Sequence, residues 1–119
     1  MKKIFLILLM LSSSVSLAKA QVSGGFEGPV ADAPKQITIQ EALILNDDDK
    51  VVLEGNIINS LGDEKYTFKD ATGEIIIEID DEDWNGEKAT PENTVVIFGE
   101  VDKDIDEPTK IDVESFKIK

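Results

Sequence analysis

The chain has 119 residues, with 25 acidic side chains, 12 lysines and a net charge of −13 at pH 7. Because it contains no histidine and no cysteine, the common catalytic triads are excluded and a structural zinc site is not expected. The negative charge opposes binding to phosphate backbones and anionic membranes, and it favours metal ions, polyamines and basic peptides.

The first 20 residues have the pattern of a secretory signal peptide. Two lysines precede an apolar run at residues 4–11, and the small-x-small sequence Ala18-Lys19-Ala20 stands before Gln21. The run is far shorter than the roughly 20 apolar residues that a membrane-spanning helix needs. Residues 1–20 are therefore predicted to be cleaved, with no membrane insertion. Cleavage leaves nine lysines against 25 acids, a net charge of −16.

A stretch with several glycines and prolines follows at residues 21–36 and is predicted to be an extended N-terminal arm. After it, Thr38 and Glu41 have the spacing of a capping box, in which each side chain satisfies a free amide at a helix start. Apolar residues then recur with helical spacing until an acidic run. We expect a short helix from about Ile39 to Leu45.

Three segments alternate polar and apolar residues as β-strands do, and they lie at about 50–59, 65–70 and 74–80. The first contains Gly55, where a bulge or sharp bend is expected. A tight turn joins the second segment to the third, and a positive φ is expected there at Gly73. These segments predict a bent strand followed by a hairpin.

The longest connection is 81–93, and its Trp84 is expected to plug one end of a barrel. Strands at 94–102 and 110–118 complete the set, and a loop at 103–109 joins them. The pattern predicts a mainly β protein, a five-stranded Greek-key barrel of the OB type. A short N-terminal helix and a short helical segment between strands three and four are expected to complete this domain, residues 37–119.

Nucleic acid is the common ligand of such barrels, bound by a basic groove with aromatic residues on the outer face of strands two and three. Here the alternation places lysines, a threonine, glutamates and Ile76 on that face, and no aromatic residue. Because the net charge also opposes the release of counterions from phosphates, nucleic acid is not expected as a partner.

In OB barrels the loops after strands one and four flank the binding face. Both are acidic here, at 59–64 and 103–109, and a third acidic run begins at Asp80. We expect these segments to attract a cationic peptide or basic protein segment, although solubility alone also explains an acidic surface. Trp84 is either the plug or an anchor for such a ligand. The predicted ligand contacts are Asp63, Glu64, Asp80, Asp81, Asp83, Trp84, Asp104 and Asp106.

Three aspartates are spaced like the start of a calcium-binding loop, whose odd positions supply oxygen ligands: Asp102, Asp104 and Asp106. The rest of that pattern is missing. Glu107 stands where the turn glycine belongs, and Val113 where the closing glutamate belongs. A dedicated high-affinity loop is therefore not expected, and the three aspartates are candidates for weak calcium binding only.

Ordered motifs run through the whole mature chain. They are G-G-F-E-G-P at 24–29, V-x-L-E-G-N-I at 51–57, L-G-D-E-K-Y-T-F-K-D-A-T-G-E-I at 61–75, E-I-D-D-x-x-W at 78–84 and T-P-E-N-T-V at 90–95. In this order they resemble the bacterial OB-fold (BOF) family of YgiW/YdeI-type stress-tolerance proteins. The resemblance implies a periplasmic, single-domain OB fold linked to envelope or oxidative stress. It implies no catalytic residue and no cofactor.

The sequence thus predicts a periplasmic, non-enzymatic OB-fold binding protein that captures a cationic ligand on acidic loops and is expected to be a monomer. Two alternatives stay open. One is a structural protein that binds calcium weakly. The other is a cell-wall glycan binder, for which only Trp84 or Phe26 could supply the aromatic platform.

Overall fold

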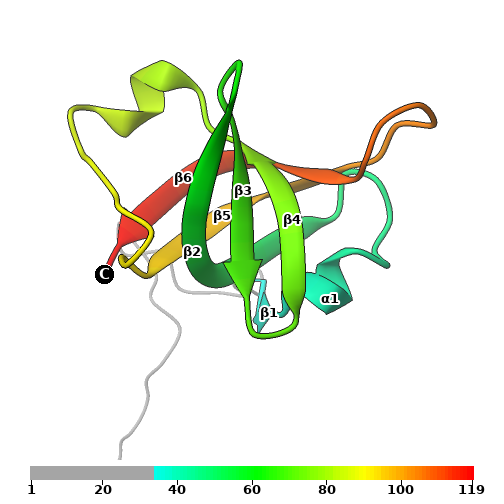
Figure 1. Cartoon of the computed structure of the whole chain (residues 1–119). Helices are drawn as coiled ribbons and strands as arrows, with labels where there is room; N and C mark the ends of the chain where they lie inside the picture. The colour runs from blue at the N-terminus through cyan, green and yellow to red at the C-terminus, as the bar shows by residue number, and fades with distance from the viewer. Residues whose placement is uncertain (1–33) are drawn as a thin grey trace, which may run out of the picture. The chain divides into compact units, whose positions relative to one another are not determined.

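The computed structural model describes residues 34–119. The predicted signal peptide, the predicted arm as far as residue 33, and Phe26 lie outside the described residues. Within them the elements follow the chain in this order: β1 (Gln36–Ile37), α1 (Ile39–Ala42), β2 (Lys50–Gly62), β3 (Lys65–Asp70), β4 (Gly73–Glu78), η3 (Asp81–Trp84, a 3₁₀-helix), β5 (Val95–Asp102) and β6 (Lys110–Ile118) (Figure 1).

Five of the strands close into a barrel, as predicted for an OB fold. The sheet order is β1-β2-β3-β4-β6-β5, and β5 returns to pair with β2. The pairing of β4 with β6 is parallel and short, from Ile76 opposite Lys110 to Glu78 opposite Asp112. The long β2 pairs with β5 through its first half and with β3 through its second half. One strand therefore contributes to two sides of the barrel (Figure 1).

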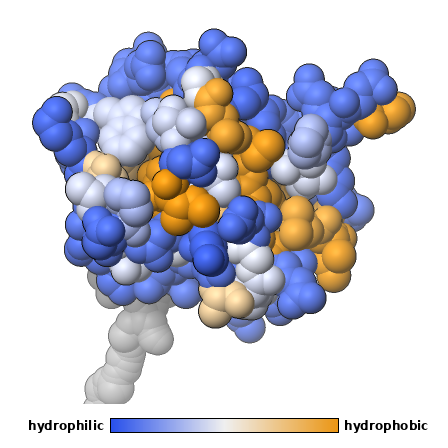
Figure 2. Space-filling view, viewed as in Figure 1, coloured by the Kyte–Doolittle hydropathy of each residue, from blue (hydrophilic) through white to orange (hydrophobic). Residues whose placement is uncertain are grey.

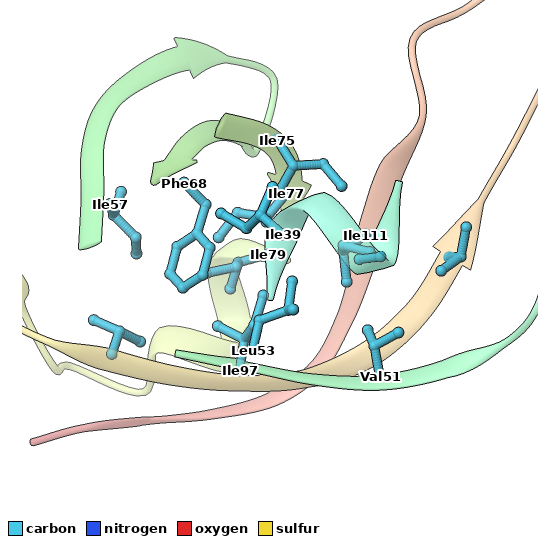
Figure 3. Close-up of a cluster of buried hydrophobic side chains, with 13 residues drawn as sticks. Ile39, Val51, Leu53, Ile57, Phe68, Ile75, Ile77, Ile79, Ile97 and Ile111 are labelled. Atoms are coloured by element: carbon cyan, nitrogen blue, oxygen red, sulfur yellow. The ribbon is translucent and has the colours of Figure 1, made fainter. Parts of the chain in front are cut away.

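The barrel core is filled by residues that alternate along the strands. In β4 and just after it, Ile75, Ile77 and Ile79 are buried, whereas Ile76 between them is only half-buried on the outer face. Figure 3 shows Leu53 and Ile97 pointing from the opposite wall toward the same interior. No charged or polar residue is fully buried among the described residues, so burial of apolar area is the main contribution of this core to stability.

The helix is shorter than predicted. The capping box is present, since Thr38 Oγ1 accepts from the Glu41 amide at 3.1 Å and Glu41 Oε1 accepts from the Thr38 amide at 2.9 Å. The helix nevertheless ends at Ala42 rather than Leu45, and the chain turns through the polar sequence 46–49. A helix this short is not stable in isolation. Burial of Ile39 and Ala42 against the barrel stabilises it.

The hairpin between β3 and β4 forms at the predicted position by a different mechanism. Gly73 does not have the positive φ that was expected. The Asp70 carboxylate instead accepts hydrogen bonds from the amides of Thr72 and Gly73, at 2.7 and 3.1 Å. An aspartate at the first turn position often organises a turn in this way, so the glycine is not needed for its backbone conformation.

Two features of the strands were not predicted. β1 adds two residues in parallel to β2, with Gln36 opposite Val52 and Ile37 opposite Leu53. β2 extends to Gly62, so the predicted loop at 59–64 is reduced to a two-residue turn. Among residues 34–119, none of the helices has the length and apolar character required to cross a bilayer.

Candidate functional site

The turn between β2 and β3 has the backbone geometry of a tight hairpin. Asp63 and Glu64 have φ values of 55° and 66°, which matches the type of two-residue turn that suits the twist of paired strands. Glu64 also joins this turn to the next segment. Its carbonyl oxygen accepts from the Ile79 amide at 2.9 Å, and its Oε2 accepts from the Asp81 amide at 2.6 Å.

Carboxylates gather where this turn meets η3. Oxygen atoms of Glu64, Glu78 and Asp80 lie within 4.8 Å of one another. Loss of solvent raises the pKa of Asp80 above its ordinary value, and the charges of Glu64, Asp83, Glu78 and Asp81 raise it further. Mutual repulsion of this kind is relieved when a cation approaches. We call Glu64, Glu78, Asp80, Asp81 and Asp83 the acidic cluster.

Lys110 lies beside this cluster and is already engaged. Its side chain is only 12% exposed, and its Nζ pairs with Asp102 and lies 3.5 Å from Glu78. The hydrogen bond to Asp102 is the largest of the causes that raise the pKa of Lys110. Asp102, one of the three aspartates considered for calcium, is therefore held by an ammonium group from β6.

Trp84 packs against the barrel core beside two other aromatic side chains. Its ring meets Tyr66 edge-on at a centroid distance of 5.7 Å and Phe116 at 5.0 Å. The side chain is half-buried against the core, which is the arrangement expected of a plug. Its Nε1 is buried, and no hydrogen-bond acceptor for it exists among the described residues.

The remaining predicted contacts lie elsewhere. Asp104 and Asp106 are exposed on the loop between β5 and β6, which extends away from η3 in Figure 1. Asp63 is exposed at the tip of the β2–β3 turn. The structure therefore brings Glu64, Asp80, Asp81 and Asp83 together and leaves the loop aspartates apart from them.

An apolar groove of about 360 Å³ lies on the outer face of β3 and β4. Figure 2 shows apolar surface on this side of the molecule, interrupted and bordered by hydrophilic side chains. Leu61 of β2, 49% exposed, and Leu43 after α1, 39% exposed, both contribute to it. We call this the β4 groove, and its lining residues are Leu43, Leu61, Thr67, Glu74, Ile75, Ile76, Pro108 and Thr109.

The β4 groove and the acidic cluster are neighbours along one strand. Glu74, Ile76 and Glu78 share the outer face of β4, because alternate residues point the same way. The groove therefore contains Glu74 and Ile76, and the next outward residue, Glu78, belongs to the cluster. Across from them on β3, Lys69 is opposite Glu74 and Lys65 is opposite Glu78.

Sequence reasoning missed Glu78, Leu61 and Lys110 as parts of this region. The alternation along the strand predicts that Ile76 faces outward. An isoleucine at a solvent-facing strand position is the sequence signal that indicates this apolar surface. No local signal marked Lys110, because its position beside Glu78 depends on the parallel pairing of β4 with β6.

Comparisons with known proteins agree with this architecture. A family model described as bacterial OB fold (BOF) protein matches residues 13–118. Protein YgiW of Escherichia coli K12 is 37% identical over 127 residues, covering 98% of this chain and 97% of that protein. The calcium-regulated OB-fold protein CarO of Pseudomonas aeruginosa is 39% identical over 108 residues, covering 91% and 87%. The solved structure of the hypothetical protein ygiW from E. coli has a TM-score of 0.69 at 43% identity, covering 82% of this chain and all of that one.

Proposed function

Since the chain belongs to the bacterial OB fold (BOF) family, we propose that it is a periplasmic binding protein, not an enzyme, that captures a cationic ligand and thereby contributes to envelope or oxidative stress tolerance. The family resemblance in the sequence motifs is confirmed by these matches. The ligand class is a basic peptide or protein segment. The signal-peptide pattern of residues 1–20 supports the location.

The acidic cluster is the observation that carries this proposal. Loss of solvent raises the pKa of Asp80, and repulsion by the neighbouring carboxylates raises it further. The nearby ammonium group of Lys110 is held by Asp102 and Glu78. A ligand ammonium group would lower the free energy of the cluster when it binds. The long-range field of residues 34–119, with 23 acids and nine lysines, would raise the encounter rate and would weaken with salt.

The test is binding of a lysine-rich peptide to the protein and to two variants of equal charge. Asp80→Asn removes a cluster carboxylate, whereas Glu92→Gln removes an exposed carboxylate in the 85–94 connection. We expect Asp80→Asn to weaken binding about two- to fivefold, the effect of one exposed charge pair. We expect Glu92→Gln to change it much less.

Stability provides an independent readout for the same pair of variants. Because the pKa of Asp80 is raised in the folded state, its ionised form opposes folding at neutral pH. Asp80→Asn should therefore raise the melting temperature while it weakens binding. Equal affinity of the two variants for the peptide at low salt would contradict the assignment of the cluster as the binding site.

Weak calcium binding is a second candidate, favoured by one distance. Carboxylate oxygens from Glu64, Glu78 and Asp80 within 4.8 Å of one another are close enough to share an ion with calcium–oxygen distances of about 2.3–2.6 Å. The name of the relative CarO refers to regulation by calcium. Calcium that displaces the peptide competitively at millimolar concentration would favour this candidate, and chemical shifts unchanged by calcium would remove it.

Export has its own test. Mass spectrometry of the protein recovered from the periplasmic fraction of an expressing bacterium should give the mass of a chain that begins at Gln21. Recovery of the uncleaved chain in the cytoplasmic fraction alone would contradict a periplasmic function.

No observation on the described residues supports the glycan alternative, because Trp84 is packed between Tyr66 and Phe116.

A further inference from the structure

The β4 groove is apolar surface that the electrostatic proposal does not use. Its walls come from segments far apart in the sequence: Leu61 from β2, Ile76 from β4, and Pro108 with Thr109 from the loop before β6. Leu61 leaves about half of its surface in water. Burial of such surface by a ligand contributes about 25 cal/mol for each Å² removed from water.

The border of the groove is charged unequally. Glu74 lines it, and Glu78 of the acidic cluster follows on the same face of β4. The loop on its far side carries the exposed residues Asp104, Asp106 and Glu107. Three lysines stand near this border: Lys65 and Lys69 on β3, opposite Glu78 and Glu74, and Lys103 at the start of the loop. Apolar floor and acidic border together complement a ligand that has both apolar and cationic groups.

We infer that the β4 groove binds the apolar side chains of a cationic amphipathic peptide segment, while the acidic cluster and the loop 103–109 hold its lysines or arginines. This inference rests on the proposed function and narrows its ligand class, from any basic peptide to one in which apolar and basic residues are interspersed. The apolar part supplies affinity that salt does not screen, and the charged part supplies the encounter rate.

Three short peptides of equal length separate the two contributions. In the first, lysine and leucine alternate; in the second, serine replaces leucine; in the third, glutamine replaces lysine. We expect the lysine–leucine peptide to bind at least about tenfold more tightly at physiological salt than the lysine–serine peptide, as expected for burial of one or two leucine side chains. We expect the glutamine–leucine peptide to bind more weakly than the lysine–leucine peptide.

Variants locate the binding surface. Leu61→Ser and Ile76→Thr each remove apolar surface from the groove at positions that the core does not bury. Ile44→Ser is the matched control, because Ile44 is 80% exposed and does not line the groove. We expect the first two variants to bring the lysine–leucine peptide close to the affinity of the lysine–serine peptide, and the control to leave both affinities unchanged. The amide chemical shifts of Thr67 and Ile76 should change when the lysine–leucine peptide binds.

Each result has a distinct meaning. Equal affinity of the lysine–leucine and lysine–serine peptides would overturn the groove inference and leave electrostatic capture standing. Binding of neither lysine peptide would overturn the proposed function itself. Equal binding of the glutamine–leucine and lysine–leucine peptides would overturn the cationic requirement. An unchanged affinity in Leu61→Ser and Ile76→Thr would place the apolar contacts outside the β4 groove.

Discussion

Gly99 of β5 packs directly against the backbone of Asp112 on β6. A Cβ atom at Gly99 would overlap the Asp112 carbonyl oxygen and would lie 3.0 Å from Ile111 Cγ2. The pairing of the two strands shifts register at this point, between Phe98 and Gly99. Gly55 of β2 has the same relationship with the carbonyl of Lys69 on β3. Both glycines therefore stand where a side chain would collide with the backbone of the neighbouring strand.

Substitution of Gly99 by alanine should destabilise the fold. The added methyl group meets backbone rather than a movable side chain, so we expect Gly99→Ala to lower the free energy of unfolding by at least about 2 kcal/mol. Gly73→Ala is the control, because a Cβ there meets only Ile39 Cγ2 at 4.0 Å and its φ is not positive. It should change stability by less than about 1 kcal/mol. Urea unfolding measures both, and equal effects would contradict the explanation.

Asp70 should make the hairpin between β3 and β4 sensitive to acid. Burial raises the pKa of Asp70, but hydrogen bonds from Thr72, Ile39 and Gly73 lower it below the ordinary value of 3.8. A carboxyl group with a lowered folded-state pKa stabilises the protein above its unfolded pKa, and this contribution is lost as pH falls through the folded value. We therefore expect the free energy of unfolding to decrease as the pH is lowered below about 4. In the Asp70→Asn variant this decrease should be less steep.

The same variant should lose stability at neutral pH. Asp70→Asn weakens an acceptor that three amides share, so we expect a loss of about 1–2 kcal/mol in urea unfolding at pH 7. Glu74→Gln is the control, because Glu74 is an exposed acid on the following strand. A loss in Glu74→Gln as large as that in Asp70→Asn would point to general charge effects instead of the hairpin.

Lys110 should be the lysine whose removal matters most for stability among residues 34–119, since it joins β6 to β5 and β4. Lys110→Met leaves Asp102, Glu78 and Asp112 without their cation, and we expect a loss of about 2 kcal/mol at pH 7. The loss of stability caused by Lys110→Met should be smaller at acidic pH, because these carboxylates are then protonated. Lys88→Met, at an exposed position, should have little effect in the same urea titrations.

The dependence of stability on pH in alkaline solution gives a second check on the role of Lys110. Its pKa is raised above 10.5 in the folded state, chiefly by Asp102. The stabilisation is therefore complete below the unfolded-state pKa of about 10.4, and it is lost as pH rises through the folded value. The difference in stability between the protein and Lys110→Met should narrow above pH 10. A difference that stays constant there would exclude the ion pair as its cause.

Trp84 should tolerate phenylalanine far better than alanine. Trp84→Phe keeps an aromatic ring between Tyr66 and Phe116 and removes the buried Nε1 that lacks an acceptor, so its cost should be below about 1 kcal/mol. Trp84→Ala removes both ring contacts and should cost about 2–3 kcal/mol. Circular dichroism during thermal unfolding compares the two. Equal losses would indicate that Nε1 makes an important hydrogen bond.

The strands and the inward residues could be predicted because alternation is a local signal. Phe68, Ile75 and Ile77 alternate with the residues that the sequence assigns to the outer face, and all three are buried. The end of α1 and the mechanism at Gly73 were predicted wrongly for one reason: tertiary contacts decided them. The barrel holds the single turn of helix, and the Asp70 side chain organises the turn in place of the glycine.

The site was predictable only in part, because proximity across strands is not local. Glu64 and Asp80 are 16 positions apart, and they meet because β3 and β4 form a hairpin between them. Glu78 has the same alternating pattern as its neighbours and gave no separate signal. The β4 groove depends on Leu61, which the sequence placed in a loop and which the structure places in β2.

The parallel contact between β4 and β6 also constrains when the domain can fold. β6 is the last strand in chain order, yet it pairs with β5 along eight positions and closes the barrel against β4. A chain that emerges from a ribosome or a translocation channel starting with its N-terminus cannot complete this wall until residues 110–118 have emerged. Until then, β4 and β5 each lack a partner along one edge. The barrel of a nascent chain therefore stays open at these two edges until the last strand is available, which delays folding of the domain.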